Sequence, residues 1–192
     1  EHGKRVKLIR HVSESTGINL AVALDTKGPE IRLGNFKNDT ENYQIGEIVY
    51  LEKAEIDGTH ERFHIQVPEL FEDLKQGNSI LINDGKMRLT VLENDGKEMK
   101  CRVEVAGPIS SHKGCNVPGV KLSMPFLSQK DEDDIRFGCQ QDVDFIFASF
   151  TRRAQDINQI RKICIEEGKP RINIIAKIEN QEGYDNIDSI LE

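Results

Sequence analysis

The stretch Ile172-Asn173-Ile174-Ile175-Ala176-Lys177-Ile178-Glu179 indicates the fold of this chain most directly. Its first five residues form a short apolar run, which is typical of a parallel-sheet strand that is buried on both faces. Lys177 and Glu179 follow at the carboxyl end of this run. Because they are two positions apart on extended backbone, their side chains are expected to point the same way.

Two similar runs lie upstream, at residues 20–24 and 145–148, and each also ends in polar residues. The first is followed by Asp25-Thr26-Lys27 and the second by Ser149-Phe150-Thr151. Helical spacing of apolar residues predicts a helix at 5–15, one from a Ser128 cap to about residue 141, one at 154–167 and a last one ending at 192. Alternating strands and helices predict a parallel α/β fold, part of a (β/α)₈ (TIM) barrel.

Between residues 29 and 123 the pattern changes to short alternating segments, which predicts a small all-β barrel. Asn-Asp-Gly turns at residues 83–85 and 94–96 are typical of antiparallel hairpins. This segment interrupts the chain where a strand-to-helix loop is expected, so it reads as an inserted domain placed to act as a lid. The predicted domains are therefore a barrel segment at 1–28, the inserted lid at 29–123 and a second barrel segment at 124–192.

Composition narrows the classes of function. The 192 residues carry a formal charge of -7 and no Lys/Arg-rich run, which argues against a nucleic-acid partner. No apolar stretch is long enough to span a membrane and no secretory signal is visible, so a cytoplasmic protein without membrane contact is expected. The four cysteines are widely spaced, which predicts free thiols.

The polar residues after the three strands should converge, because the carboxyl ends of parallel barrel strands lie on one face. A lysine beside a carboxylate suits an anionic substrate held through a divalent metal, with Glu179 as an oxygen ligand and Lys177 neutralising developing charge. The plainer interpretation of Lys177 and Glu179 is an ordinary salt bridge at a strand end. The pattern alone leaves both open.

Three segments, residues 23–32, 143–150 and 175–183, resemble pyruvate kinase in content and in order. The resemblance covers nearly the whole chain and is loosest between residues 38 and 61. It implies phosphoryl transfer from phosphoenolpyruvate to ADP, giving pyruvate and ATP. By the same resemblance, Lys177 is catalytic and binds substrate together with Ser149.

The resemblance also implies cations. It makes Glu179 a ligand of Mg²⁺ or Mn²⁺, and makes Asp25 and Thr26 ligands of K⁺. At position 30, where this sequence has Glu30, it resembles the potassium-dependent members of the family. Potassium dependence is therefore expected.

Further site residues are implied within the inserted segment. Arg32 and Lys113 align with contacts to the nucleotide, and Asp84 with a catalytic aspartate of the lid. Taken alone, Arg32 could be an exposed strand-edge residue and Asp84 a hairpin residue. His112 departs from the lysine expected beside Lys113 and is assigned no role, while Asp95 is interpreted as a turn residue.

The family's other active-site strands, one of them bearing the second metal carboxylate, have no counterpart in this sequence. The chain is therefore expected to leave the barrel open and to be inactive alone, while a longer parent would be a homotetramer. Two alternatives remain: a non-catalytic folded lid module, and another phosphate-binding TIM-barrel enzyme.

Overall fold

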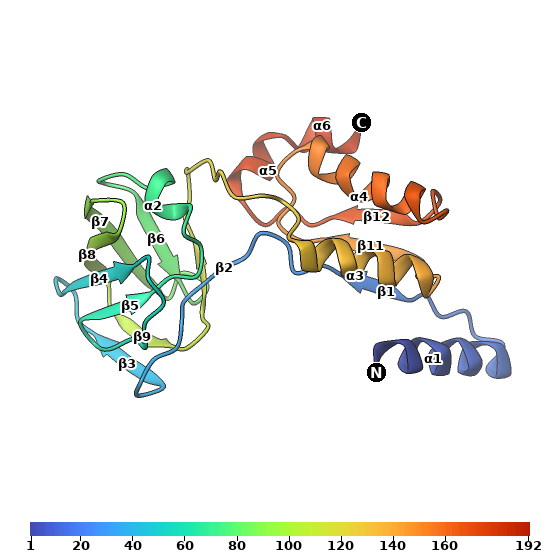
Figure 1. Cartoon of the computed structure of the whole chain (residues 1–192), viewed down its shortest axis with the longest axis horizontal. Coiled ribbons are helices and arrows are strands. Elements are labelled where there is room, and N and C mark those ends of the chain that lie inside the picture. The colour runs from blue at the N-terminus through green and yellow to red at the C-terminus, as the bar shows by residue number, and fades with distance from the viewer. The chain divides into compact units, whose positions relative to one another are not determined.

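The computed structural model describes residues 1–192 and divides into two compact units. Unit 1 comprises residues 1–29 and 125–192, and unit 2 comprises residues 30–124. In chain order, unit 2 therefore lies between the first strand and the second long helix of unit 1 (Figure 1). No helix has the length and apolar character needed to cross a membrane.

Unit 1 is built on a three-stranded parallel sheet. Strand β11 (Phe145–Ala148) lies in the centre, between β1 (Ala23–Asp25) and β12 (Asn173–Ala176). Helices α3 (Gln129–Gln140) and α4 (Ala154–Glu166) precede and follow the central strand (Figure 1). The parallel strands and linking helices confirm the predicted α/β fold.

Helices α3 and α4 pack against each other, and their buried residues share a core with one face of the sheet. The fully buried side chains of this core come from strand β11 and from both helices: Ile135, Cys139, Ile146, Ala148, Ile160 and Cys164. The predicted cap of α3 is confirmed, since Ser128 Oγ accepts the Asp131 N–H at 3.1 Å and Asp131 accepts the Ser128 N–H at 3.0 Å.

The prediction that the outer strands are buried on both faces is wrong for this chain. The run at 20–24 forms a strand only from Ala23, and Leu20 and Ile175 remain 41% and 43% exposed. The reason is topological, because β1 and β12 are both edge strands of a sheet that carries helices over one face. An apolar run reveals that a strand belongs in a sheet, but its burial depends on neighbours from elsewhere.

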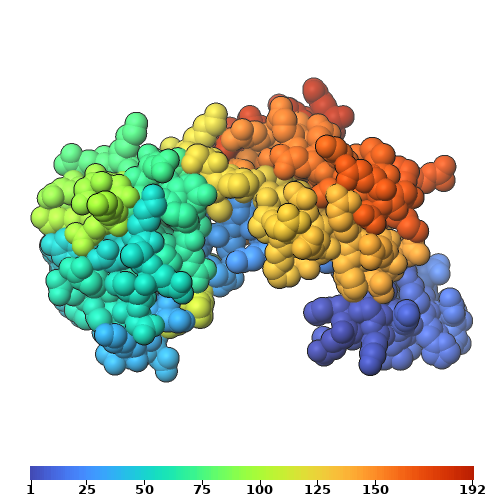
Figure 2. Space-filling model, in the orientation of Figure 1, coloured from blue at the N-terminus to red at the C-terminus, as the bar shows by residue number.

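The terminal helices of unit 1 are weakly buried. Helix α1 (His2–Thr16) begins before its predicted start, contributes no buried residue, and ends at Gly17 in the left-handed conformation. Figure 2 shows it in dark blue at the margin of the unit. The predicted last helix is divided into α5 (Gln181–Asp185) and α6 (Ile187–Leu191).

Unit 2 contains a seven-stranded sheet in the order β2-β10-β6-β7-β8-β4-β5. These strands are β2 (Ile31–Arg32), β4 (Ile48–Glu52), β5 (Arg62–His64), β6 (Ser79–Ile82), β7 (Met87–Asn94), β8 (Glu98–Val105) and β10 (Gly114–Asn116). Leu33 forms an antiparallel bridge with Ile65, and the Gln66 N–H donates to the Arg32 carbonyl at 2.8 Å. The first and last strands of the order are thereby joined, so the sheet closes and its edges are protected.

Several elements of unit 2 escaped the sequence pattern. Strands β3 (Thr40–Tyr43) and β9 (Gly107–Ser110) pair only with each other, and α2 (Leu70–Asp73) is a single turn. Neither strand is continuously apolar, and Pro108 lies inside β9. Such segments become strands because a distant partner supplies their hydrogen bonds. The two predicted Asn-Asp-Gly turns are confirmed between β6 and β7 and between β7 and β8.

Candidate active site

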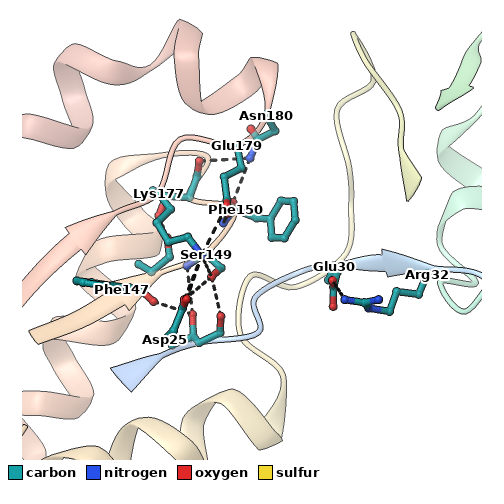
Figure 3. Close-up of polar contacts among 12 residues, drawn as sticks. Asp25, Glu30, Arg32, Phe147, Ser149, Phe150, Lys177, Glu179 and Asn180 are labelled. Carbon is teal, nitrogen blue, oxygen red and sulfur yellow. Dashed lines mark hydrogen bonds and ion pairs between the residues drawn. The ribbon is translucent and has the colours of Figure 1, made fainter. Parts of the chain in front are cut away.

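Lys177 lies directly beyond β12 and reaches back across the carboxyl ends of all three strands of unit 1 (Figure 3). Its Nζ atom lies 2.9 Å from Ser149 Oγ and 3.1 Å from Asp25 Oδ1. Glu179 Oε1 is 3.6 Å away. The predicted convergence of the strand ends is therefore seen, with one ammonium group between a hydroxyl and two carboxylates.

A second set of contacts joins the ends of β1 and β11. Ser149 Oγ lies 3.0 Å from Asp25 Oδ1 and 2.6 Å from the Thr26 carbonyl oxygen, and its single proton can serve one of them at a time. The Ser149 N–H donates to Thr26 Oγ1 at 3.2 Å. Ser149 and Thr26 are almost fully buried, so these contacts fix both strand ends against each other.

Glu179 is oriented through the backbone of the neighbouring loop. The N–H of Phe150 donates to Glu179 Oε2 at 2.9 Å (Figure 3). This leaves Oε1 as the carboxylate oxygen that faces Lys177. Phe150 has φ = 54°, a left-handed conformation that is unusual for a bulky residue.

The charges around Lys177 outweigh the effect of its burial. Desolvation lowers the pKa of this ammonium group, but the hydrogen bond to Asp25 and the charges of Glu179 and Asp25 raise it, and the net shift is upward from 10.5. Lys177 is therefore a cation throughout the neutral range. It is suited to holding an anionic group and not to accepting a proton.

The loop after β1 is held by a buried carboxylate. Asp131 Oδ1 accepts the Gly28 N–H at 3.2 Å, and Asp131 Oδ2 accepts the Ser128 N–H and hydroxyl at 3.0 and 2.6 Å. A single side chain, 2% exposed, thus ties the start of α3 to the loop that follows Asp25 and begins with Thr26. Asp131 belongs to the first turn of α3, and its contact with Gly28 has no signature in the sequence.

The remaining predicted residues, Arg32, Lys113 and Asp84, belong to unit 2, where neighbouring strands bring their positions together. Arg32 pairs in register with Gly114, which follows Lys113, and the N–H of Asn83, which precedes Asp84, donates to the Gly114 carbonyl at 2.9 Å. Within unit 2, Arg32 is ion-paired with Glu30 and donates to the His112 carbonyl at 2.7 Å. The Glu30 hydrogen bond raises the pKa of Arg32, which stays cationic.

The oxygen atoms of unit 1 differ in how well they suit cations. The carboxylate of Asp25, the carbonyl of Thr26 and the hydroxyl of Ser149 form a group of hard donors that fits a monovalent cation in chemical type. For a divalent cation, Glu179 provides a carboxylate whose Oε1 atom faces Lys177. No group of three or more His, Cys, Asp or Glu side chains is arranged to hold a metal ion.

Two contributors to this site were missed by sequence reasoning. The Phe150 N–H contacts Glu179, and Asn180 Nδ2 donates to the carbonyls of Phe150 and Thr151 at 3.2 and 3.4 Å. An asparagine before a short helix signals a cap, but its contact with a distant loop has no sequence signature. The left-handed conformation of Phe150 is equally invisible in sequence.

Comparison with known proteins gives a consistent result. The family model described as pyruvate kinase, barrel domain, matches residues 1–192. Pyruvate kinase of Clostridium acetobutylicum is 42% identical over 193 residues, and those of Staphylococcus aureus and Staphylococcus saprophyticus are 44% identical over 194 residues.

Each alignment covers 100% of this chain, which spans 41% of the clostridial protein and 33% of the staphylococcal proteins. The similarity therefore extends over the whole length of this chain. This chain belongs to the pyruvate kinase family.

Proposed function

We propose that the full-length protein containing this chain transfers the phosphoryl group of phosphoenolpyruvate to ADP, giving pyruvate and ATP. The observation that carries the proposal is the position of Lys177, whose ammonium group lies within hydrogen-bond distance of Ser149 and Asp25 at the carboxyl ends of parallel strands. Ligands of open and closed parallel α/β sheets bind at this end. Membership of the pyruvate kinase family supports this reaction.

In this reaction an oxygen of the ADP β-phosphate attacks phosphorus, and the bond from phosphorus to the enol oxygen breaks. The enolate that leaves takes a proton on carbon to become pyruvate. Lys177 holds its charge near the transferring group and the enolate oxygen, where negative charge develops. Ser149 helps to orient the substrate, and its burial keeps its hydroxyl group fixed beside Lys177.

The cation ligands are proposed on donor chemistry. Asp25 and Thr26 contribute oxygens to a K⁺ site, and Glu179 contributes one carboxylate oxygen to Mg²⁺ or Mn²⁺, whose other ligands come from outside this chain. A bound divalent cation would neutralise phosphate charge. This chain's contribution is to hold the Glu179 carboxylate through the Phe150 N–H.

Unit 2 is proposed to act as the lid and to supply Arg32 and Lys113 to the nucleotide phosphates and Asp84 as a catalytic residue. The antiparallel register brings these three positions to neighbouring strands. The Arg32 guanidinium is paired with Glu30, so nucleotide binding would compete with that ion pair.

The decisive experiment compares Lys177→Met and Lys177→Arg with the wild-type full-length protein. Loss of the Lys177 ammonium group should lower kcat by roughly two orders of magnitude or more, while the Kd for ADP changes little. Lys177→Arg retains the charge and should recover part of the rate. Wild-type kcat in Lys177→Met would remove Lys177 from the mechanism.

A second candidate applies to the 192-residue chain by itself, which we propose is a folded but non-catalytic module. The supporting observation is its sheet of three strands with exposed edge-strand residues, among them Ile175 at 43%. A coupled assay for ATP formed from phosphoenolpyruvate should show no turnover by the isolated chain. Robust turnover would refute this proposal.

A further inference from the structure

The loop that orients Glu179 is held in an unfavourable backbone conformation. Phe150 has φ = 54°, which costs a residue with a Cβ roughly 1 kcal/mol or more relative to the right-handed region. In this arrangement its N–H lies 2.9 Å from Glu179 Oε2. Some other group must therefore stabilise the loop.

One such group is the side chain of Asn180, the residue after Glu179, which contacts the loop carbonyls directly. Its Nδ2 atom donates to the carbonyls of Phe150 at 3.2 Å and Thr151 at 3.4 Å (Figure 3). Its Oδ1 atom accepts the Gly183 N–H at 2.8 Å and so caps helix α5. One planar amide therefore bridges the loop and the helix.

The close packing of α5 keeps this amide in place. A Cβ atom at Gly183 would lie 2.3 Å from the Thr151 carbonyl oxygen, so the first turn of the helix lies directly against the loop. Asn180 cannot move away from Phe150 without displacing the helix that it caps. The contact is thus built into the packing of unit 1.

We propose that Asn180 is a positioning residue, whose amide group holds Phe150 in the left-handed conformation from which the Phe150 N–H orients the Glu179 carboxylate. The proposal rests on the proposed role of Glu179 as a ligand of a divalent cation. The Asn180 amide is engaged by the Phe150 and Thr151 carbonyls and the Gly183 N–H, so it acts on Glu179 through the backbone. Partners of this kind commonly alter metal affinity about 10- to 100-fold when they are removed.

The test uses the full-length protein with Asn180→Ser. Serine is a good helix cap and can still accept the Gly183 N–H, but it lacks the amide that donates to the two loop carbonyls. The Kd for Mn²⁺, measured from free Mn²⁺ by electron paramagnetic resonance, should rise about 10- to 100-fold. The KM for ADP should stay within about twofold of the wild-type value, because Asn180 is not proposed to contact the nucleotide.

Asn186→Ser provides the matched control. Asn186 Nδ2 donates to the Arg152 carbonyl at 3.0 Å, so the same chemical change removes a similar bond from a neighbouring backbone position. Its Kd for Mn²⁺ should equal that of the wild type. Equal weakening in Asn186→Ser and Asn180→Ser would assign the effect to general loosening and overturn the proposal.

A rescue variant tests the backbone route. Glycine adopts positive φ without the steric cost, so Phe150→Gly introduced into Asn180→Ser should recover part of the lost Mn²⁺ affinity. A purely structural role for Asn180 predicts further weakening by the added glycine. Amide exchange at residue 150 without metal should be faster in Asn180→Ser than in the wild type.

The possible failures are separable. Wild-type protein that forms no ATP from phosphoenolpyruvate would refute the proposed function, whatever Asn180 does. An active wild type together with an Asn180→Ser variant of unchanged Mn²⁺ affinity would refute the role of Asn180 alone. Asn180→Thr, which also retains a capping oxygen, replaces Asn180→Ser if the serine variant does not fold.

Discussion

A Cβ atom at position 28 would lie 2.5 Å from the carbonyl oxygen of Ser149, so Gly28 packs against the backbone of the central strand's end. Gly28 also has φ = 67°. Gly28→Ala should therefore combine a backbone clash with a left-handed alanine and destabilise unit 1 by about 2–4 kcal/mol. Urea unfolding of the chain measures this loss.

Gly168→Ala is the control for this prediction. Gly168 has φ = 72° and no atom within 4 Å of its hypothetical Cβ, so it should lose only about 1 kcal/mol, the cost of the backbone conformation. The difference between the two variants isolates the contact with Ser149. Equal losses would show that the loop at Gly28 relaxes freely.

The Asp131 carboxylate is predicted to stabilise two segments at once. Asp131→Ala removes the reciprocal cap of α3 and also leaves the Gly28 N–H without its acceptor, which should cost about 2–4 kcal/mol. Ser128→Ala removes one capping group and should cost about 1 kcal/mol. Thermal unfolding compares them, and similar losses in both variants would contradict the link to Gly28.

The pH dependence of Lys177 follows from its neighbours. Its folded-state pKa lies above 10.5, so the stabilisation from its ion pairs is complete below 10.5 and is lost as pH rises through the higher folded value. Asp25→Asn removes a hydrogen-bond partner and a charge, and should lower the Lys177 pKa. Titration of the lysine side chain by NMR checks the direction, and an unchanged or higher pKa would contradict it.

The cysteine thiols are predicted to be unreactive in the folded chain. Burial raises the pKa of Cys101 and of Cys139 to about 12, and both side chains are fully buried. At pH 8 an aromatic disulfide reagent should therefore modify neither thiol until the chain unfolds. Above pH 9, the ordinary thiol value, ionisation of the unfolded chain should lower stability.

As a control, all four free thiols should react with the reagent when the chain is unfolded in denaturant. Modification of Cys101 or Cys139 at the same rate in native buffer and in denaturant would show that these sites open readily. Mass spectrometry of the modified peptides identifies which thiol has reacted.

Local chemistry allowed much of unit 1 to be predicted. The bounds of β11 match the predicted run at 145–148, and Ser128 caps α3 as expected. Both results depend on interactions between residues close in sequence, which composition and spacing encode. The polar residues after each strand were also placed correctly at one end of the sheet.

Long-range pairing limited the prediction of unit 2. Strands β3 and β9 lie more than sixty residues apart and carry no continuous apolar pattern, yet they pair residue by residue from Thr40–Ser110 to Tyr43–Gly107. Closure of the larger sheet depends on another contact between residues distant in sequence, that of Leu33 with Ile65. Such contacts come from the packing of the whole unit.

The sequence by itself determined the family, the α/β order and the presence of Lys177 and Glu179 at a strand end. Only the tertiary structure decided how Glu179 is held, because its orientation depends on the backbone conformation of Phe150 and on the amide of Asn180. Motifs record which residues are present at a site. The left-handed backbone and the contacts that maintain it arise when segments distant in sequence pack together, and no local pattern encodes them.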